Sequence, residues 1–159
     1  MDPEPPSLYL ALSLDWPLTI SILILLGLLV LSALISGTEV AFFSLSKSDL
    51  DDASNSKSQK SNIVDEQLKN PKKLLATILI ANNFINILIV LLFAYIGEFL
   101  FNSIQSTLLR FVIEVVLITF LILLFGEVLP KIYANRNAMK FAVFMARPIK
   151  ILNTFNEFN

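Results

Sequence analysis

Three long stretches of uncharged, mostly apolar residues alternate with polar segments along this chain. The first covers residues 16–38 and the second covers 74–97, which are 23 and 24 consecutive uncharged residues. The third, residues 111–129, is less uniform: between Arg110 and Glu127 it contains one acid, Glu114, which can pair with Arg110 four residues earlier on the same helix face. Because a helix needs about 20 apolar residues to cross a bilayer, the pattern predicts an all-α membrane protein with three transmembrane helices.

The chain after the third span has two unlike faces at helical spacing. Arg136, Lys140 and Arg147 fall within one narrow sector. The apolar residues of the opposite face are Ala134, Ala138, Phe141, Ala142, Met145 and Ile149. This pattern predicts an amphipathic juxtamembrane helix over residues 131–150 that lies in the membrane interface, with Pro148 interrupting or kinking it.

The polar segments complete the predicted organisation. Residues 1–15 are acidic and proline-containing and have no basic region, which predicts a disordered start rather than a signal peptide. Residues 46–72 are predicted to be a polar loop, mobile at its centre, with one or two helical turns over 63–69. The transmembrane domain then covers residues 16–150, and residues 151–159 form a short tail.

The distribution of lysine and arginine predicts the orientation of these segments. Six lysines lie between Lys47 and Lys73, five basic residues follow Leu129, and the start of the chain has none. By the positive-inside rule, the N-terminus lies outside, while the 46–72 loop and the tail lie in the cytoplasm.

Composition restricts the chemistry. The chain has no cysteine and no histidine, which excludes disulfides, most zinc, copper and iron sites, and Ser-His or Cys-His catalytic pairs. Aspartate is also missing between Asp15 and Asp49 and after Asp65, so no aspartyl pair lies in the spans and we predict no enzyme. The net charge of −1 indicates no nucleic-acid partner. Oxygen ligands remain, and these suit hard cations such as Mg²⁺, Ca²⁺ or Na⁺.

Each predicted span carries polar residues at a similar depth. Ser32 and Ser36 share one face of the first span, Asn82 and Asn86 share one face of the second, and Glu127 lies in the third. Polar groups inside a membrane are costly and suggest a functional site by default. At 1.5 Å per residue, all five can lie in the inner half of the membrane.

Two backbone features add to this set. Pro130 has no N–H, so the carbonyl of Gly126 loses its ordinary helical partner and becomes a candidate cation ligand beside Glu127. Gly37 permits close approach or local unwinding of the first helix. We therefore predict a cation site formed by Ser32, Ser36, Asn82, Asn86, Gly126 and Glu127.

Structural interpretations of the same residues remain open. Ser32, Ser36 and Gly37 could be small residues at a helix contact, and the asparagines could be hydrogen-bond links between helices. Glu127 could pair with Lys131. Glu39 could be a second ligand, a gate or a salt-bridge partner. Asn83 points about 100° away from Asn82, which favours a packing role.

Three motifs occur in order: SGTEVA (Ser36–Ala41), ANNFIN (Ala81–Asn86) and GEVLPK (Gly126–Lys131). Together they resemble the transmembrane domain shared by the cyclin M (CNNM) and CorB/CorC magnesium transporters, over about residues 18–150. The acidic, proline-rich start also resembles the gliding-motility relative of CorC found in Bacteroidetes. The family form has glycine where this chain has Ala81.

The resemblance implies a bacterial inner-membrane protein with three transmembrane helices and a juxtamembrane helix. It implies a homodimer, with cytoplasmic CBS domains following in the full-length protein. It also implies Mg²⁺ efflux coupled to Na⁺ entry, with a dehydrated Mg²⁺ held between the helices by the six residues predicted above. The alternative is a structural or assembly membrane protein of a secretion or gliding complex, in which the same polar residues only join helices.

Overall fold

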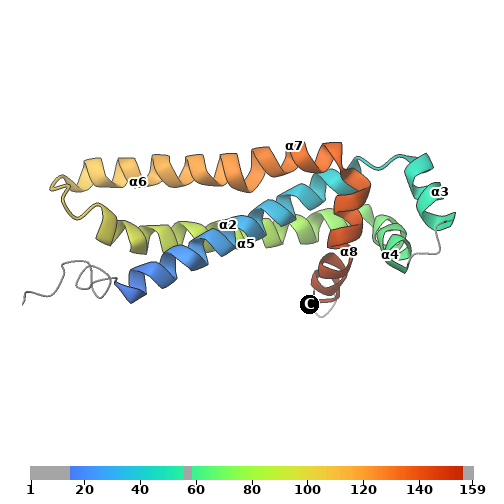
Figure 1. Cartoon of the computed structure of the whole chain (residues 1–159), viewed down its shortest axis with the longest axis horizontal. Coiled ribbons are helices and arrows are strands. Elements are labelled where there is room, and N and C mark those ends of the chain that lie inside the picture. The colour runs from blue at the N-terminus through green and yellow to red at the C-terminus, as the bar shows by residue number, and fades with distance from the viewer. Residues whose placement is uncertain (1–14, 56–58, 156–159) are drawn as a thin grey trace, which may run out of the picture.

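The structure is a computed structural model that describes residues 15–55 and 59–155. Most of the predicted disordered start (residues 1–14), residues 56–58 of the predicted loop and the last four residues of the predicted tail lie outside the described residues. Three long helical rods run along the length of the described part, and two short helices and a crossing helix gather at one end (Figure 1). We call that end the lysine-rich end, after Lys69, Lys72 and Lys73.

The three rods confirm the predicted all-α membrane fold. They are α2 (Trp16–Phe43), α5 (Pro71–Leu100), and a third rod formed by α6 (Thr107–Leu121), the π-helix η1 (Ile122–Val128) and α7 (Leu129–Arg136). Each is long and apolar enough to cross a membrane. Many of their large apolar side chains are exposed in the isolated chain, as expected for surfaces that face lipid.

The starts of two rods follow from their capping residues. The side chain of Asn70 accepts a hydrogen bond from the Lys73 amide at 3.4 Å, and Pro71 occupies the first turn of α5, where its missing N–H costs nothing. Ser106 caps α6 in the same way, through the Leu109 amide at 3.3 Å. The turn between α5 and α6, which ends at Ser106, lies at the end of the molecule opposite the lysine-rich end (Figure 1).

The third rod contains a π-helix that the hydropathy pattern did not predict. Its widened turn ends with the Leu129 amide donating to the carbonyl of Leu124, five residues back. Pro130 follows immediately, and a proline inside a helix removes one backbone donor and crowds the preceding turn. A π-helix within an α-helix commonly marks a functional site, so its position at Gly126 and Glu127 directs attention there.

The juxtamembrane helix starts later than predicted. Residues 131–136 continue the third rod as α7, the helix ends at Asn137, and α8 runs from Ala138 to Phe155 with Pro148 inside it. Its apolar face is buried against α2, α4 and α5 through Ala142, Met145, Ala146 and Ile149. An amphipathic pattern predicts that the apolar face of a helix is buried. It does not tell whether that face is buried in lipid or against other helices of the protein.

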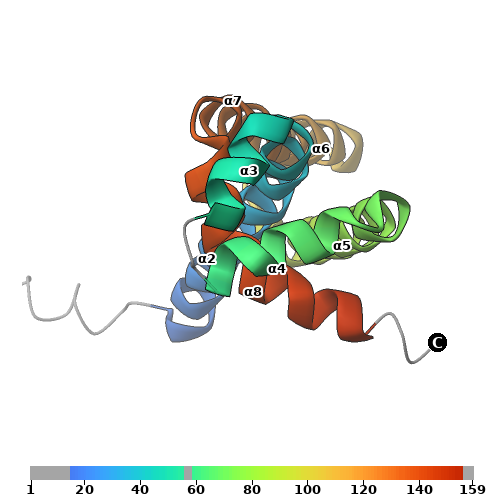
Figure 2. The same cartoon turned by 90° about the vertical axis from the view of Figure 1, so that its right-hand side faces the viewer.

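The predicted mobile loop is largely helical. It forms α3 (Lys47–Asn55) and α4 (Gln59–Leu68), which is longer than the one or two turns predicted. Figure 2 shows α4 beside α8, and Val64 of α4 is fully buried. The segment has few apolar residues, so its local sequence gave little helical signal, and packing on α8 supplies the apolar contact that stabilises α4.

Candidate metal site

The site is centred on one buried face of α2. Ser32 and Ser36 lie one turn apart on this face, and their exposed fractions are 0% and 1%. The face packs against α5 on one side and against η1 and α7 on the other. The two serines of the first predicted span are thus placed between the second and third rods.

Hydrogen bonds join Ser32 of α2 to α5, and Asn86 of α5 in turn to Glu127 of η1. The Ser32 Oγ lies 2.9 Å from Asn86 Oδ1 and 3.4 Å from Asn82 Oδ1, and Asn86 Nδ2 lies 3.5 Å from Glu127 Oε1. A serine hydroxyl has one proton, so it cannot donate fully to two amide oxygens at once. The structure therefore brings together a hydroxyl, two amide oxygens and a carboxylate from three rods.

Gly126 lies directly against Ser32. A β-carbon built at Gly126 would be 3.0 Å from Ser32 Oγ, which is closer than ordinary van der Waals contact. The absence of a side chain thus lets the π-helix backbone approach α2 closely. Since Pro130 cannot donate to it, the Gly126 carbonyl lies beside the site without its ordinary helical donor.

Ser36 differs from other hydroxyls in α2. Ser21 donates to the Pro17 carbonyl at 2.8 Å and Thr38 donates to the Leu34 carbonyl at 2.6 Å, so both satisfy themselves within the helix. Ser36 Oγ is buried and has no hydrogen-bond partner among the described residues. A buried hydroxyl without a partner costs about 1–3 kcal/mol, which calls for an explanation.

The carboxylates near the site have separate surroundings. Lys131 Nζ lies 3.2 Å from Glu39 Oε2, and both side chains are partly exposed. Of the three roles considered for Glu39, the salt bridge is the one the structure contains. This pair also leaves the alternative Glu127–Lys131 pair without support. Glu127 is the carboxylate that reaches the oxygen cluster, through its contact with Asn86.

Two smaller predictions have structural outcomes. Among the described residues, Asn83 makes no hydrogen bond to the oxygen cluster and is exposed, so the packing role that was favoured for it is not made within this part of the chain. It lines a surface groove of α5 together with Asn86. At Gly37 the helix continues without unwinding, and a β-carbon there would lie 2.6 Å from the Phe141 ring. The close approach predicted for Gly37 is therefore made to α8.

Sequence reasoning missed the π-helix and a second polar cluster. The latter consists of Gln67, Thr77 and Asn153, all buried at the lysine-rich end. Asn153 lies four residues after Ile149, on the buried face of α8, and this position was the signal available in the sequence. Whether the six predicted site residues bind a metal stays a prediction, although five of them share direct contacts and Ser36 is one turn away.

Comparison with known proteins gives consistent matches. The family model described as the cyclin M transmembrane N-terminal domain matches residues 23–156. A UPF0053 protein of Haemophilus influenzae is 34% identical over 128 residues, which are 80% of this chain and 29% of that protein. The UPF0053 inner membrane protein YfjD of Escherichia coli is 31% identical over 125 residues, 77% of this chain and 28% of that protein. The chain therefore spans less than a third of the length of these relatives.

Proposed function

Because the chain belongs to the cyclin M transmembrane domain family, we propose that it is the membrane domain of a Mg²⁺ transporter. In this proposal a dehydrated Mg²⁺ binds between α2, α5 and η1. Its ligands are drawn from the hydroxyls of Ser32 and Ser36, the amide oxygens of Asn82 and Asn86, the Gly126 carbonyl and the Glu127 carboxylate.

The unpartnered hydroxyl of Ser36 carries this proposal. A buried hydroxyl with a purely structural role has a partner within the protein, as Thr38 has in the Leu34 carbonyl. Ser36 is equally buried and has none among the described residues, which supports a role for its hydroxyl as an ion ligand. Mg²⁺ favours octahedral oxygen coordination at about 2.0–2.1 Å, which places neighbouring ligands about 2.9 Å apart. The Ser32–Asn86 oxygen separation of 2.9 Å fits such an edge.

A single carboxylate suits transport better than storage. Glu127 neutralises only half the charge of a divalent ion, so binding is weak enough for release and open to competition by Na⁺. We propose alternating access at this site, with Mg²⁺ efflux coupled to Na⁺ entry. Transport by a reconstituted protein should then depend on an opposing Na⁺ gradient, and loss of that dependence would remove the coupling from the proposal.

The setting of the protein is proposed on similar grounds. The inner-membrane designation of YfjD supports a bacterial inner-membrane location. The lysine-rich end is proposed to face the cytoplasm, where CBS domains would lie in the full-length protein. The chain is proposed to act as a homodimer. Asn83 supports this, because it lines a groove of about 370 Å³ on α5 and an exposed amide at membrane depth is better covered by protein than by lipid.

The alternative assembly role draws support from the Ser32–Asn86 hydrogen bond, which is the kind that joins helices. The two proposed functions predict different effects of mutation on folding and on the response to Mg²⁺. Substitution of a joining residue impairs folding with or without Mg²⁺. Substitution of an ion ligand removes the response to Mg²⁺ while the protein remains folded.

The test is thermal unfolding of the purified protein in detergent across a Mg²⁺ titration. Wild type should be stabilised by Mg²⁺, whereas Glu127→Gln and Ser36→Ala should lose this response. Matched controls are Glu98→Gln, at the far end of α5, and Ser21→Ala, whose hydroxyl bonds within its own helix. If both site variants respond to Mg²⁺ like wild type, the site is misplaced.

A further inference from the structure

A second polar pocket lies at the lysine-rich end, away from the oxygen cluster. It has a volume of about 260 Å³ and is formed where α4, α5 and α8 meet. Lys73 of α5 and Lys150 of α8 line it, together with Glu66 of α4. Two ammonium groups and one carboxylate leave the lining with one net positive charge.

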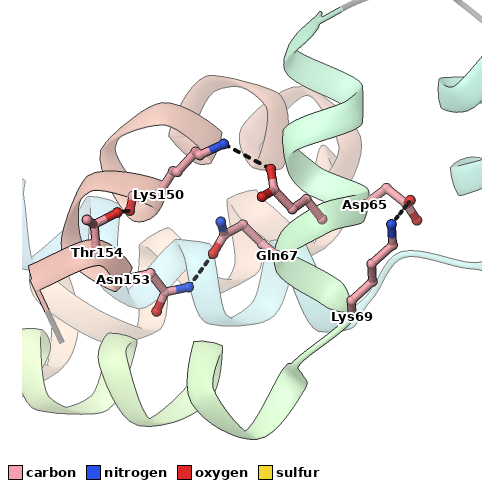
Figure 3. Close-up of polar contacts among 7 residues, drawn as sticks. Asp65, Gln67, Lys69, Lys150, Asn153 and Thr154 are labelled. Carbon is pink, nitrogen blue, oxygen red and sulfur yellow. Dashed lines mark hydrogen bonds and ion pairs between the residues drawn. The ribbon is translucent and has the colours of Figure 1, made fainter. Parts of the chain in front are cut away.

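Buried hydrogen bonds hold the walls of this pocket in place. Thr77 Oγ1 donates to Asn153 Oδ1 at 2.6 Å, and Asn153 Nδ2 donates to Gln67 Oε1. Lys150 Nζ lies 2.9 Å from Glu66 Oε2. Figure 3 shows Asn153 of α8 and Gln67 of α4 directed toward each other, with the Lys150 side chain directed toward a carboxylate of α4. The pocket is thus part of a built network, not a gap between mobile side chains.

An apolar groove begins at the floor of this network. It has a volume of about 440 Å³, and Thr77 lines it while bonding to Asn153 of the polar pocket. From there it extends between α2 and α5 to Leu88, about 16 Å along the helix at 1.5 Å per residue. Leu31 of α2 and Phe84 of α5 line its sides, and Leu152 of α8 lies near its start.

The two features together have the shape and chemistry of a lipid site. A cationic polar pocket lies at the end of membrane-spanning helices, and an apolar groove leads from it along the same helices. We propose that the chain binds an anionic phospholipid here. Its phosphate lies against Lys73 and Lys150, and one acyl chain fills the groove. The two lysines favour an anionic over a zwitterionic headgroup, because basic residues at the membrane surface attract anionic lipids.

Native mass spectrometry of the full chain in detergent, titrated with phosphatidylglycerol, tests this proposal. We expect one tightly bound lipid in wild type and about fivefold weaker binding in Lys73→Gln and in Lys150→Gln. The matched control is Lys72→Gln, an exposed neighbour that does not line the pocket. Lys73→Arg keeps the charge and should restore binding, which separates loss of contact from loss of folding.

The groove has its own pair of variants. Leu31→Trp fills the groove and should weaken lipid binding, whereas Leu23→Trp, on an exposed part of α2 outside the groove, should not. Equal weakening by Lys72→Gln and Lys73→Gln would overturn the proposal in favour of diffuse surface charge. It would be overturned equally by phosphatidylethanolamine binding as tightly as phosphatidylglycerol, or by inorganic phosphate displacing the lipid at matched concentration.

Discussion

At the scale of single residues, the partner of each polar group separates structural from ligand roles. Hydroxyls such as Thr38 satisfy themselves on their own helix, and Glu39 is paired with Lys131. Ser32 and Asn86 join two rods and reach Glu127, while Ser36 has no partner among the described residues. That buried side chain without a partner therefore lies one turn from the residues that join the rods, on the same face of α2 as Ser32.

Asn86 and Asn83 provide a direct comparison between an inward and an outward amide. Asn86→Ala removes the group that contacts both Ser32 and Glu127, so we expect Mg²⁺ affinity to fall about 10- to 100-fold, the equivalent of about 1.5–3 kcal/mol. Asn83→Ala should leave that affinity unchanged. Isothermal titration of both variants with Mg²⁺ measures the difference, and similar losses in both would place the ion elsewhere.

A substitution at Glu39 tests whether a second carboxylate, besides Glu127, binds Mg²⁺. In Glu39→Gln the partner of Lys131 is lost, but both side chains are more than a third exposed. The free energy of unfolding should therefore fall by less than about 1 kcal/mol, and stabilisation by Mg²⁺ should persist. The same thermal titration used for Glu127→Gln reports both quantities. Loss of the Mg²⁺ response in Glu39→Gln would make Glu39 a ligand.

At the scale of elements, the π-helix determines how the third rod meets the first. Gly126 lies in η1 and touches Ser32, whereas Gly27 of α2 has open space around it. Both glycines lie in helices, so both have a helix propensity lower than that of alanine by the same amount. What differs between them is the approach of a neighbouring helix.

Gly126→Ala and Gly27→Ala therefore form a matched pair. Gly27→Ala should keep or slightly raise stability, since alanine favours helix by up to about 1 kcal/mol. Gly126→Ala should be less stable than Gly27→Ala by about 1–3 kcal/mol, because the new methyl group forces Ser32 away. Chemical unfolding in detergent compares them. Equal stability would show that the contact between η1 and α2 yields easily.

Comparison of the predicted with the observed helices shows which parts of the fold follow from the sequence pattern. The three spans were predicted because a run of about 20 apolar residues crosses a bilayer as a helix, which satisfies its own backbone groups. Five of the six predicted site residues lie in contact, because polar groups at matching depth have few other places to lie, and metal binding by them stays a prediction. The helix α4 and the start of α8 at Ala138 were missed, because both depend on packing between segments rather than on local pattern.

At the scale of the whole molecule, polarity differs between the two ends of the bundle. The lysine-rich end carries α3, α4 and α8, while the other end has the short turn between α5 and α6, beside the Arg110–Glu114 ion pair at 2.8 Å (Figure 1). This asymmetry is what the positive-inside rule uses to predict that α3 and α4 lie in the cytoplasm. With the lysine-rich end in the cytoplasm, the oxygen cluster lies in the half of the membrane nearer the cytoplasm.

The natural absence of cysteine makes this orientation easy to test. Ser48→Cys lies in α3 and Ser103→Cys lies in the turn between α5 and α6, and both positions are exposed. In intact spheroplasts, a membrane-impermeant maleimide should label Ser103→Cys, and it should label Ser48→Cys only after permeabilisation. The reverse pattern would invert the topology. It would then place the oxygen cluster closer to the outer face, so that proposed ion release to the outside would no longer require passage across most of the membrane.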